Sequence, residues 1–118
     1  MERVLCVGSV TTDVIVTPVD TLPPPGVLQA VRGTTTHVGG CASNAAIDLA
    51  KLGAPASLSC RVGQDSLGDF VAATVSQAGV DASGIVRDPK VSTTSSVVLV
   101  HSDGERSFLY NPGSTFSF

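Results

Sequence analysis

Two adjacent glycines followed by a run of small residues constrain the fold of this chain most tightly. The stretch reads GGCASNAAIDLAKLG and runs from Gly39 to Gly53. A segment rich in Val and Thr precedes it, and apolar residues then recur at a helical spacing, which predicts a strand, a sharp turn and a helix. Glycine permits close approach to the main chain and tolerates a positive φ. Gly39 and Gly40 therefore form either a tight turn or a surface on which a ligand lies, and these residues alone favour the turn.

The other segments alternate between strand and helix patterns. The predicted strands are 3–9, 13–17, 28–38 and 55–63, and the predicted helices are 41–52 and 65–79. Gly53 is expected to end the first helix, and Asp65 or Ser66 to cap the second. Asp103-Gly104 lies between two β-prone arms and predicts a hairpin over residues 91–111. Four prolines between Pro18 and Pro25 predict a loop. Strand–helix–strand alternation is typical of an α/β fold with a parallel sheet, and we expect the Thr-rich strands and the hairpin to form a smaller antiparallel sheet at its side.

Composition narrows the classes of function. Charged residues make up only 14% of the chain and hydrophobic residues 42%, which predicts a sheet buried on both faces or an apolar surface meant for a neighbour. The net charge is −3 and the basic residues are scattered, so we expect no nucleic-acid partner. No apolar run approaches the roughly 20 residues of a membrane span. Three cysteines without metal-ligand spacing are typical of reduced thiols, and we expect a cytoplasmic protein without a metal site.

A few polar residues stand where the chemistry of a site is expected. Asp13 follows the first strand, and ligands of open α/β sheets gather beyond the carboxyl ends of the strands; the alternative is a turn made by the aspartate with its own backbone. Asn44, near the start of the first predicted helix, can donate to and accept from a polar ligand or can simply be solvated. Cys41 is interpreted as a small packing residue, with a reactive thiol as the alternative. The chain contains no P-loop and no G-x-G-x-x-G.

Together these segments resemble the N-terminal part of the ribokinase/PfkB family of carbohydrate kinases. The family's first signature is matched by residues 39–63, GGCASNAAIDLAKLGAPASLSCRVG. The opening strand and substrate aspartate of the family are matched by residues 7–13, VGSVTTD. Its G-x-D-x-x-G motif is matched at residues 63–69, and the stretch after its lid hairpin, often P-G-A-N, at residues 111–118, NPGSTFSF. The residues that carry the G-x-D-x-x-G match are Gly63, Asp65 and Gly68.

The resemblance implies a fold and a function. Such kinases phosphorylate a hydroxyl of a sugar, nucleoside or similar small molecule with ATP and Mg²⁺, and combine a doubly wound α/β domain with a small β-sheet lid. Residues 1–118 are then the N-terminal segment of such a domain, with lid strands at about 13–38 and 95–110. The implied substrate-binding residues are Asp13, Thr11, Gly39, Gly40 and Asn44. Lid sheets in this family often pair across a dimer, so a homodimer through the lid is also an expectation.

The chain departs from the family in several places. Thr11 replaces an Asn that the family often has two residues before Asp13, Cys41 replaces a Lys common in ribokinases, and the P-G-A-N stretch reads PGST. The first two departures weaken the case for ribose. The family's second signature, D-T-x-G-A-G-D, supplies the catalytic base and the anion hole, and it does not occur in this sequence. We therefore expect no catalytic, nucleotide-binding or metal-binding residue here and no activity or bound cofactor for these residues alone; the alternative is a naturally short binding or dimerisation module.

Overall fold

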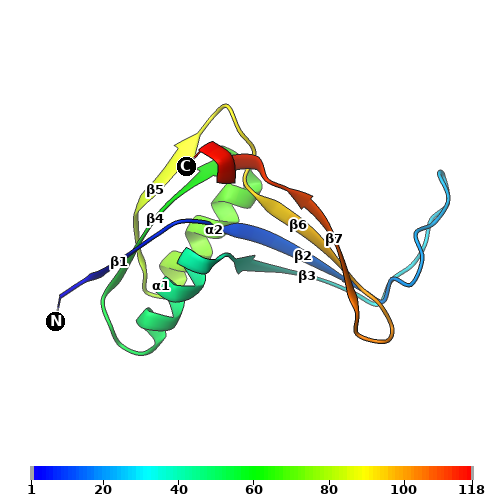
Figure 1. Ribbon diagram of the computed structural model, residues 1–118, viewed down its shortest axis with the longest axis horizontal. Helices are drawn as coiled ribbons and strands as arrows, with labels where there is room; N and C mark the ends of the chain where they lie inside the picture. The colour runs from blue at the N-terminus through cyan, green and yellow to red at the C-terminus, as the bar shows by residue number, and fades with distance from the viewer. Residues whose placement is uncertain (1, 118) are drawn as a thin grey trace.

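The computed structural model describes residues 2–117, which form two sheets, two α-helices and a short 3₁₀ helix (Figure 1). Phe118, the end of the family match at 111–118, lies outside the described residues. A three-stranded parallel sheet has the order β1-β4-β5, with β1 at Val4–Val7, β4 at Ala56–Gly63 and β5 at Asp81–Asp88. A four-stranded sheet has the order β3-β2-β6-β7, with β2 at Thr11–Thr17, β3 at Gly33–Gly39, β6 at Ser95–Val100 and β7 at Arg106–Asn111. The helices are α1 at Cys41–Lys51, α2 at Ser66–Gln77 and the 3₁₀ helix η1 at Gly113–Ser117.

The hydrophobic core lies between the three-stranded sheet and the two α-helices. Alternate residues of β4 point toward the helices, and Leu58, Cys60 and Val62 are completely buried there. They join one cluster with Val71 of α2 and Ala46 of α1. Burying an aliphatic side chain of this size contributes about 1.5–3 kcal/mol, so this cluster holds both helices on the sheet. The small residues of α1 let that helix approach the strands closely.

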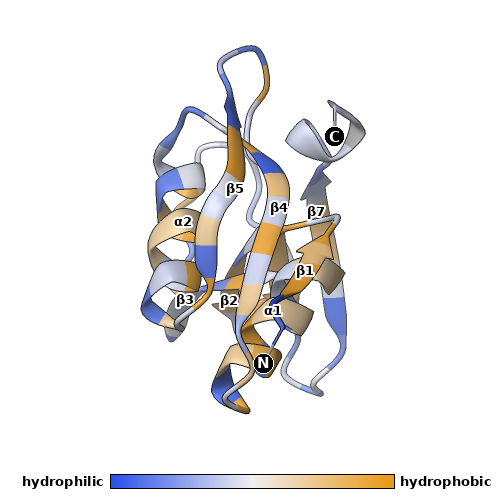
Figure 2. Cartoon of the chain, turned by 90° about the vertical axis from the view of Figure 1, so that its left-hand side faces the viewer, coloured by the Kyte–Doolittle hydropathy of each residue, from blue (hydrophilic) through white to orange (hydrophobic). Residues whose placement is uncertain are grey.

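The opposite face of the three-stranded sheet carries no α-helix among the described residues. Figure 2 shows the three strands in the foreground, with the helices behind and beside them. Leu5, Val7 and Val86 point to this open face and are 61%, 57% and 46% exposed. Parallel sheets are normally covered on both faces. The low charge fraction of the sequence thus corresponds to an apolar sheet face that these residues leave open.

The four-stranded sheet is mixed, which corrects the predicted antiparallel arrangement. Its outer strands are antiparallel to their neighbours, but the central strands β2 and β6 are parallel, with Asp13 beside Ser96. The cause is that both central strands leave the three-stranded sheet at its carboxyl edge, β2 after β1 and β6 after β5, so they project in the same direction (Figure 1).

One strand was missed by the sequence prediction, and one was predicted too long. β5 escaped prediction because Gly84 interrupts its apolar pattern and charged residues occupy its ends. The glycine is needed there because a Cβ at position 84 would lie 2.7 Å from the carbonyl oxygen of Leu58. The strand predicted at 28–38 begins only at Gly33. Residues 28–32 belong instead to an arm, residues 18–32, that projects from the four-stranded sheet (Figure 1).

Several local predictions are confirmed. Asp65 caps α2 by accepting a hydrogen bond from the amide of Gly68 at 2.8 Å. Gly53 has a φ of +86° directly after α1, as expected of a glycine that ends a helix. The hairpin turns at Asp103-Gly104, where the amide of Gly104 donates to the carbonyl of His101. The predicted α/β class is therefore confirmed.

Candidate functional site

Asp13 lies on β2 and is surrounded by the other residues predicted to bind a substrate, with one exception. Thr11 is the register partner of Gly39, and Asp13 is that of His37. Because paired residues share a face of the sheet, Thr11, Asp13 and Gly39 lie together on one side. The hydroxyl of Thr11 lies 3.3 Å from Oδ1 of Asp13 and 3.4 Å from the carbonyl oxygen of Thr94. The carboxylate is half-buried and keeps open acceptor positions.

The two glycines between β3 and α1 serve different purposes. A Cβ at Gly40 would lie 2.6 Å from the carbonyl oxygen of Ser9 and 2.8 Å from Cα of Val10, and the φ of Gly40 is +100°. Gly40 is thus required by the turn itself. A Cβ at Gly39 would lie 2.6 Å from Oδ2 of Asp13. Gly39 therefore leaves space for the carboxylate, so the tight turn explains only one of the two glycines.

Helix α1 begins beside this carboxylate. No side chain caps its amino terminus, so N–H groups of its first turn remain available to a ligand. The hydroxyl of Ser43 instead donates back to the carbonyls of Gly39 and Gly40, which fixes the turn. The site therefore combines a carboxylate, a hydroxyl and the positive end of a helix, a set that suits a ligand with several hydroxyl groups.

Asn44 is the exception among the predicted site residues. It is exposed on α1 and lines a groove of about 440 Å³ that Asp13 does not line. The groove lies between β3 and the two α-helices. Its other lining residues are Thr36, His37, Val38, Ile47, Asp48, Lys51, Phe70, Thr74 and Ala78. Asp13, Thr11 and the glycines are thus brought together, whereas the side chain of Asn44 lines this groove, one helical turn after Gly40, to whose carbonyl the amide of Asn44 donates.

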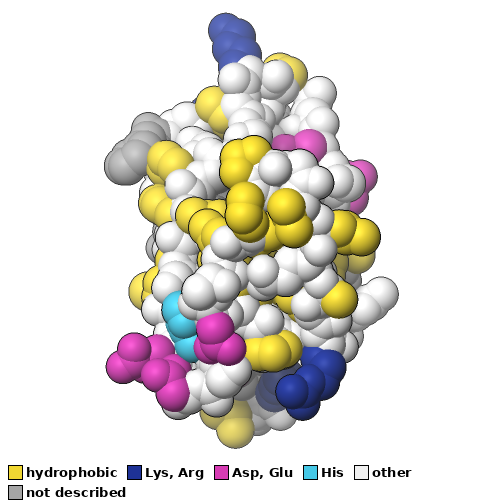
Figure 3. Space-filling view, turned by 90° about the vertical axis from the view of Figure 1, so that its right-hand side faces the viewer, with side chains coloured by type: hydrophobic (Ala, Val, Ile, Leu, Met, Phe, Trp, Pro, Cys, Tyr) yellow, Lys and Arg dark blue, Asp and Glu magenta, His cyan; other side chains and the backbone are white. Residues whose placement is uncertain are grey.

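Two aromatic residues share the face of Asp13 and were missed by the sequence reasoning. The register places Asp13 beside Ser96 on β6, and Ser96 opposite Tyr110 on β7. Phe108 precedes Tyr110 by two residues on β7 and therefore points to the same face. Tyr110 and Phe108 are 57% and 62% exposed. Figure 3 shows hydrophobic side chains gathered on the end of the molecule that carries the four-stranded sheet. The hairpin turn fixes which β7 residues face Ser96, but the pairing of β2 with β6 spans about eighty residues and leaves no local signal.

The three cysteines differ in exposure. Cys60 is completely buried, and burial raises the pKa of its thiol to about 11. Cys6 is half-buried against the core. Cys41 is exposed at the start of α1. The interpretation of Cys41 as a packing residue is therefore wrong, because its side chain points away from the core that Ala42 and Ala46 enter.

The described residues offer no metal centre. Among residues 2–117, no group of three or more His, Cys, Asp or Glu side chains is placed to hold a metal ion. Residues 2–117 thus show no ligand set of this size for Mg²⁺. Within the same residues, no helix is both long and apolar enough to cross a membrane.

The fold defines a class: an α/β protein in which a second sheet projects from the carboxyl edge of a parallel sheet, with the carboxylate of Asp13 near the junction. The profile of the pfkB family carbohydrate kinases matches residues 1–118. Fructokinase-1 from Oryza sativa is 38% identical over 72 residues, which is 61% of this chain and 22% of the relative. ATP-dependent ribose-1-phosphate kinase from Halopiger xanaduensis is 36% identical over 113 residues, 96% of this chain and 38% of the relative. The chain belongs to the pfkB family of carbohydrate kinases.

Solved structures agree with this assignment. The ribokinase of Arabidopsis thaliana, solved with ribose and ATP, superimposes with a TM-score of 0.84 at 29% identity, over 95% of this chain and 36% of that one. The fructokinase of Xylella fastidiosa gives a TM-score of 0.79 at 30% identity, over 98% of this chain and 34% of that one. The predicted family and ribokinase-like fold are confirmed. The chain spans between a fifth and two fifths of the length of the relatives named here.

Proposed function

We propose that these residues form the substrate-binding and lid segment of an ATP-dependent kinase that phosphorylates a hydroxyl of a sugar or nucleoside. The observation that carries the proposal is the carboxylate of Asp13, which Gly39 makes room for and which stands beside the uncapped start of α1. Oδ1 accepts from the hydroxyl of Thr11, but each carboxylate oxygen has more than one acceptor position, so the carboxylate can still accept hydrogen bonds from two neighbouring hydroxyl groups at once. Neighbouring hydroxyls are the feature that sugars and nucleosides share.

Each residue near Asp13 then has a role in the proposed site. Thr11 orients the carboxylate through its hydroxyl. Gly39 makes room for the carboxylate, and Gly40 allows the turn that would bring the main chain at the start of α1 to the substrate. Asn44 completes the predicted set with its amide, but its place in a separate groove makes it the member that the structure supports least.

The four-stranded sheet is the lid in this proposal. A lid excludes water, which would otherwise accept the phosphoryl group in place of the sugar. Tyr110 and Phe108 lie on the face of Asp13 and are exposed, so they would cover the apolar C–H face of the ring while Asp13 holds the hydroxyls. The lid strands are then β2, β3, β6 and β7.

We place ATP, Mg²⁺ and the catalytic base on other parts of the complete kinase domain. Phosphoryl transfer depends on positioning and on stabilising charge, and the described residues offer no metal centre. The exposed apolar face of the three-stranded sheet, with Leu5, Val7 and Val86, is the surface that further elements of the domain would cover. By themselves, residues 1–118 would therefore transfer no phosphate.

A homodimer formed through the lid is a subsidiary proposal. The arm at residues 18–32 exposes Leu22, Val27, Leu28 and Val31. Exposed apolar clusters of this kind are typical of contact surfaces between proteins. Sedimentation of the complete protein tests the idea, since replacement of Leu22 and Leu28 by serine should convert a dimer into a monomer.

A substrate screen on the complete protein tests the main proposal. Formation of ADP is followed with pentoses, hexoses and nucleosides for the wild type and for Asp13→Ala. The substitution should lower the turnover of every accepted substrate. The loss of transition-state stabilisation should be a few kcal/mol, since each charged hydrogen bond contributes roughly 1.5–3 kcal/mol. Asp20→Ala is the control, because among residues 2–117 the carboxylate of Asp20 accepts its hydrogen bonds from Ser102 near the hairpin tip. Undiminished turnover by Asp13→Ala would refute the assignment of the site.

A further inference from the structure

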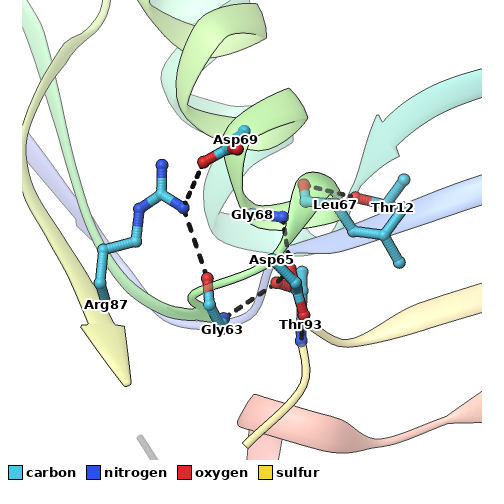
Figure 4. Close-up of polar contacts among 8 residues, drawn as sticks. All are labelled: Thr12, Gly63, Asp65, Leu67, Gly68, Asp69, Arg87 and Thr93. Atoms are coloured by element: carbon cyan, nitrogen blue, oxygen red, sulfur yellow. Dashed lines mark hydrogen bonds and ion pairs between the residues drawn. The ribbon is translucent and has the colours of Figure 1, made fainter. Parts of the chain in front are cut away.

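Asp65 does more than cap helix α2. Its Oδ2 accepts a hydrogen bond from the amide of Thr93 at 2.9 Å, and its Oδ1 accepts one from the hydroxyl of Thr93 at 2.6 Å (Figure 4). The hydroxyl of Thr93 in turn accepts from the amide of Gly63 at 2.9 Å. Thr93 is completely buried and precedes the lid strand β6 by two residues. The carboxylate of Asp65, just after β4 of the parallel sheet, therefore holds the segment that leads into lid strand β6 by hydrogen bonds.

The two glycines of the G-x-D-x-x-G motif are fitted to this contact. A Cβ at Gly63 would lie 2.6 Å from the carbonyl oxygen of Val91, 2.7 Å from Oδ2 of Asp65 and 2.8 Å from the amide nitrogen of Thr93. A Cβ at Gly68 would press on the carbonyl oxygen of Gly63 and lie 3.0 Å from the hydroxyl of Thr93. Both glycines thus make room for the pairing of Asp65 with Thr93. A helix cap alone would not require the glycine at position 63.

Thr94, the next residue, extends the contact to the candidate site. Its carbonyl oxygen accepts from the amide of Thr12 at 3.0 Å and lies 3.4 Å from the hydroxyl of Thr11. The hydroxyl of Thr94 donates to the carbonyl of Pro112 at 2.7 Å, at the end of β7. Two of the chain crossings between the two sheets, from β1 to β2 and from β5 to β6, therefore meet the end of β7 at Thr93 and Thr94. The hydroxyl of Thr11 in turn contacts Asp13.

We propose that Asp65 is a positioning residue, which through Thr93 and Thr94 sets the angle of the lid and the place of Asp13 above the bound sugar. The sugar part rests on the function proposed above. The clamp is defined as Asp65, Thr93 and the amide of Gly63, and it ties β6 to the parallel sheet. Thr94 also restrains β2, because its carbonyl accepts from the amide of Thr12. Asp65 touches neither substrate nor reacting atoms.

The geometry explains why aspartate occupies this position. The carboxylate accepts three hydrogen bonds, from the amide of Gly68 and from the amide and hydroxyl of Thr93. Serine caps a helix as well as aspartate does, but its single short hydroxyl cannot also reach Thr93. Asp65→Ser therefore separates the cap from the clamp. Thr93→Val removes the hydroxyl and keeps the shape, whereas Thr93→Ser keeps the hydroxyl.

Amide hydrogen exchange of the complete protein, without substrate, tests the clamp. Asp65→Ser and Thr93→Val should each speed exchange of the lid strands β2 and β6 by about tenfold, the factor that corresponds to one hydrogen bond to a charged group. Exchange in α1 and β4 should not change. Thr93→Ser should behave as the wild type. Asp69→Asn is the matched control, because this carboxylate of the same helical turn bonds Arg87 rather than Thr93 (Figure 4).

The outcomes separate the clamp from a merely structural role. Faster exchange confined to the lid, with rescue by Thr93→Ser, supports the proposal; unchanged exchange, or an equal rise in α1 and β4, overturns it. If Thr93→Val yields too little folded protein, Asp65→Ser carries the same test. With an accepted sugar, Asp65→Ser should raise KM about tenfold with a smaller change in kcat. If the wild type phosphorylates no sugar or nucleoside, the proposed function fails, while the exchange pattern still decides the clamp.

Discussion

A Cβ atom on Gly39 of β3 would lie 2.6 Å from Oδ2 of Asp13, which stands on β2 two residues beyond Thr11, the register partner of Gly39. The clash involves the free end of a side chain, so Gly39→Ala would be accommodated by rotation of the carboxylate. We therefore expect affinity for the accepted sugar to fall by about 10- to 100-fold, the effect of one lost charged hydrogen bond. The free energy of unfolding should change by less than about 1 kcal/mol. Calorimetric titration and urea unfolding measure the two quantities, and an unchanged affinity would contradict the account.

Gly40→Ala, one residue further on, should lower the stability of the fold, which Gly39→Ala leaves nearly unchanged. Here the added Cβ meets backbone atoms of Ser9 and Val10, and the φ of +100° is unfavourable for alanine. We expect the free energy of unfolding to fall by about 1–3 kcal/mol. Urea unfolding of the two alanine variants side by side makes the comparison. Equal stability of the two variants would show that the glycines do not divide their roles in this way.

The three cysteines should react with a thiol reagent in a fixed order. Cys41 is exposed beside the proposed site, whereas Cys60 is completely buried and its thiol has a pKa of about 11. Since the thiolate is the reactive form, iodoacetamide at neutral pH should label Cys41 first and Cys60 only after unfolding. An accepted sugar should slow the labelling of Cys41. Peptide mass spectrometry measures the labelling rate of each cysteine. A labelling rate of Cys41 that is the same with and without every accepted sugar would count against the proposed site.

The stability that Asp65 confers should be lost in acid. Burial raises the pKa of this carboxyl, but hydrogen bonds from the hydroxyl and amide of Thr93 and the amide of Gly68, with the charge of Arg87, bring the pKa below the ordinary value of 3.8. A lowered pKa in the folded state stabilises the fold above pH 3.8, and this contribution disappears as the pH falls through the folded-state value.

Asp65→Asn tests this dependence, because asparagine keeps the helix cap but cannot accept from both groups of Thr93. At pH 7 it should lower the free energy of unfolding by about 1.5–3 kcal/mol, and the difference from the wild type should shrink below pH 4. Ser66→Ala is the non-titrating control in the same turn. A deficit of Asp65→Asn that stays constant from pH 7 to pH 3 would contradict the assigned ionisation.

Local patterns in the sequence predicted the elements that depend on neighbouring residues. The turn at Gly39-Gly40, the cap at Asp65 and the hairpin at Asp103-Gly104 each follow from backbone preferences within a few residues. β5 was missed because Gly84 serves a close approach to β4, a neighbour more than twenty residues away. In the sequence, Gly84 is visible only as an interruption of the apolar pattern.

The site itself was predicted in part. The resemblance to kinases pointed to Asp13, Thr11 and the two glycines, and the strand register brings these together. Tyr110 joins the same face only through the pairing of β2 with β6, which depends on how both strands leave the parallel sheet. The clamp between Asp65 and Thr93 likewise spans 28 residues. Such contacts arise from topology, and no local pattern encodes them.

The affinity of the complete protein for its accepted sugar, compared between the wild type and Asp13→Asn, tests the central claim most directly. Asparagine keeps the size of the side chain but removes the charge and one acceptor oxygen. Calorimetric titration should show a loss of about 100-fold in affinity, since the charged hydrogen bonds to two hydroxyls contribute roughly 1.5–3 kcal/mol each. Equal affinity of the two proteins would show that the sugar does not bind at Asp13.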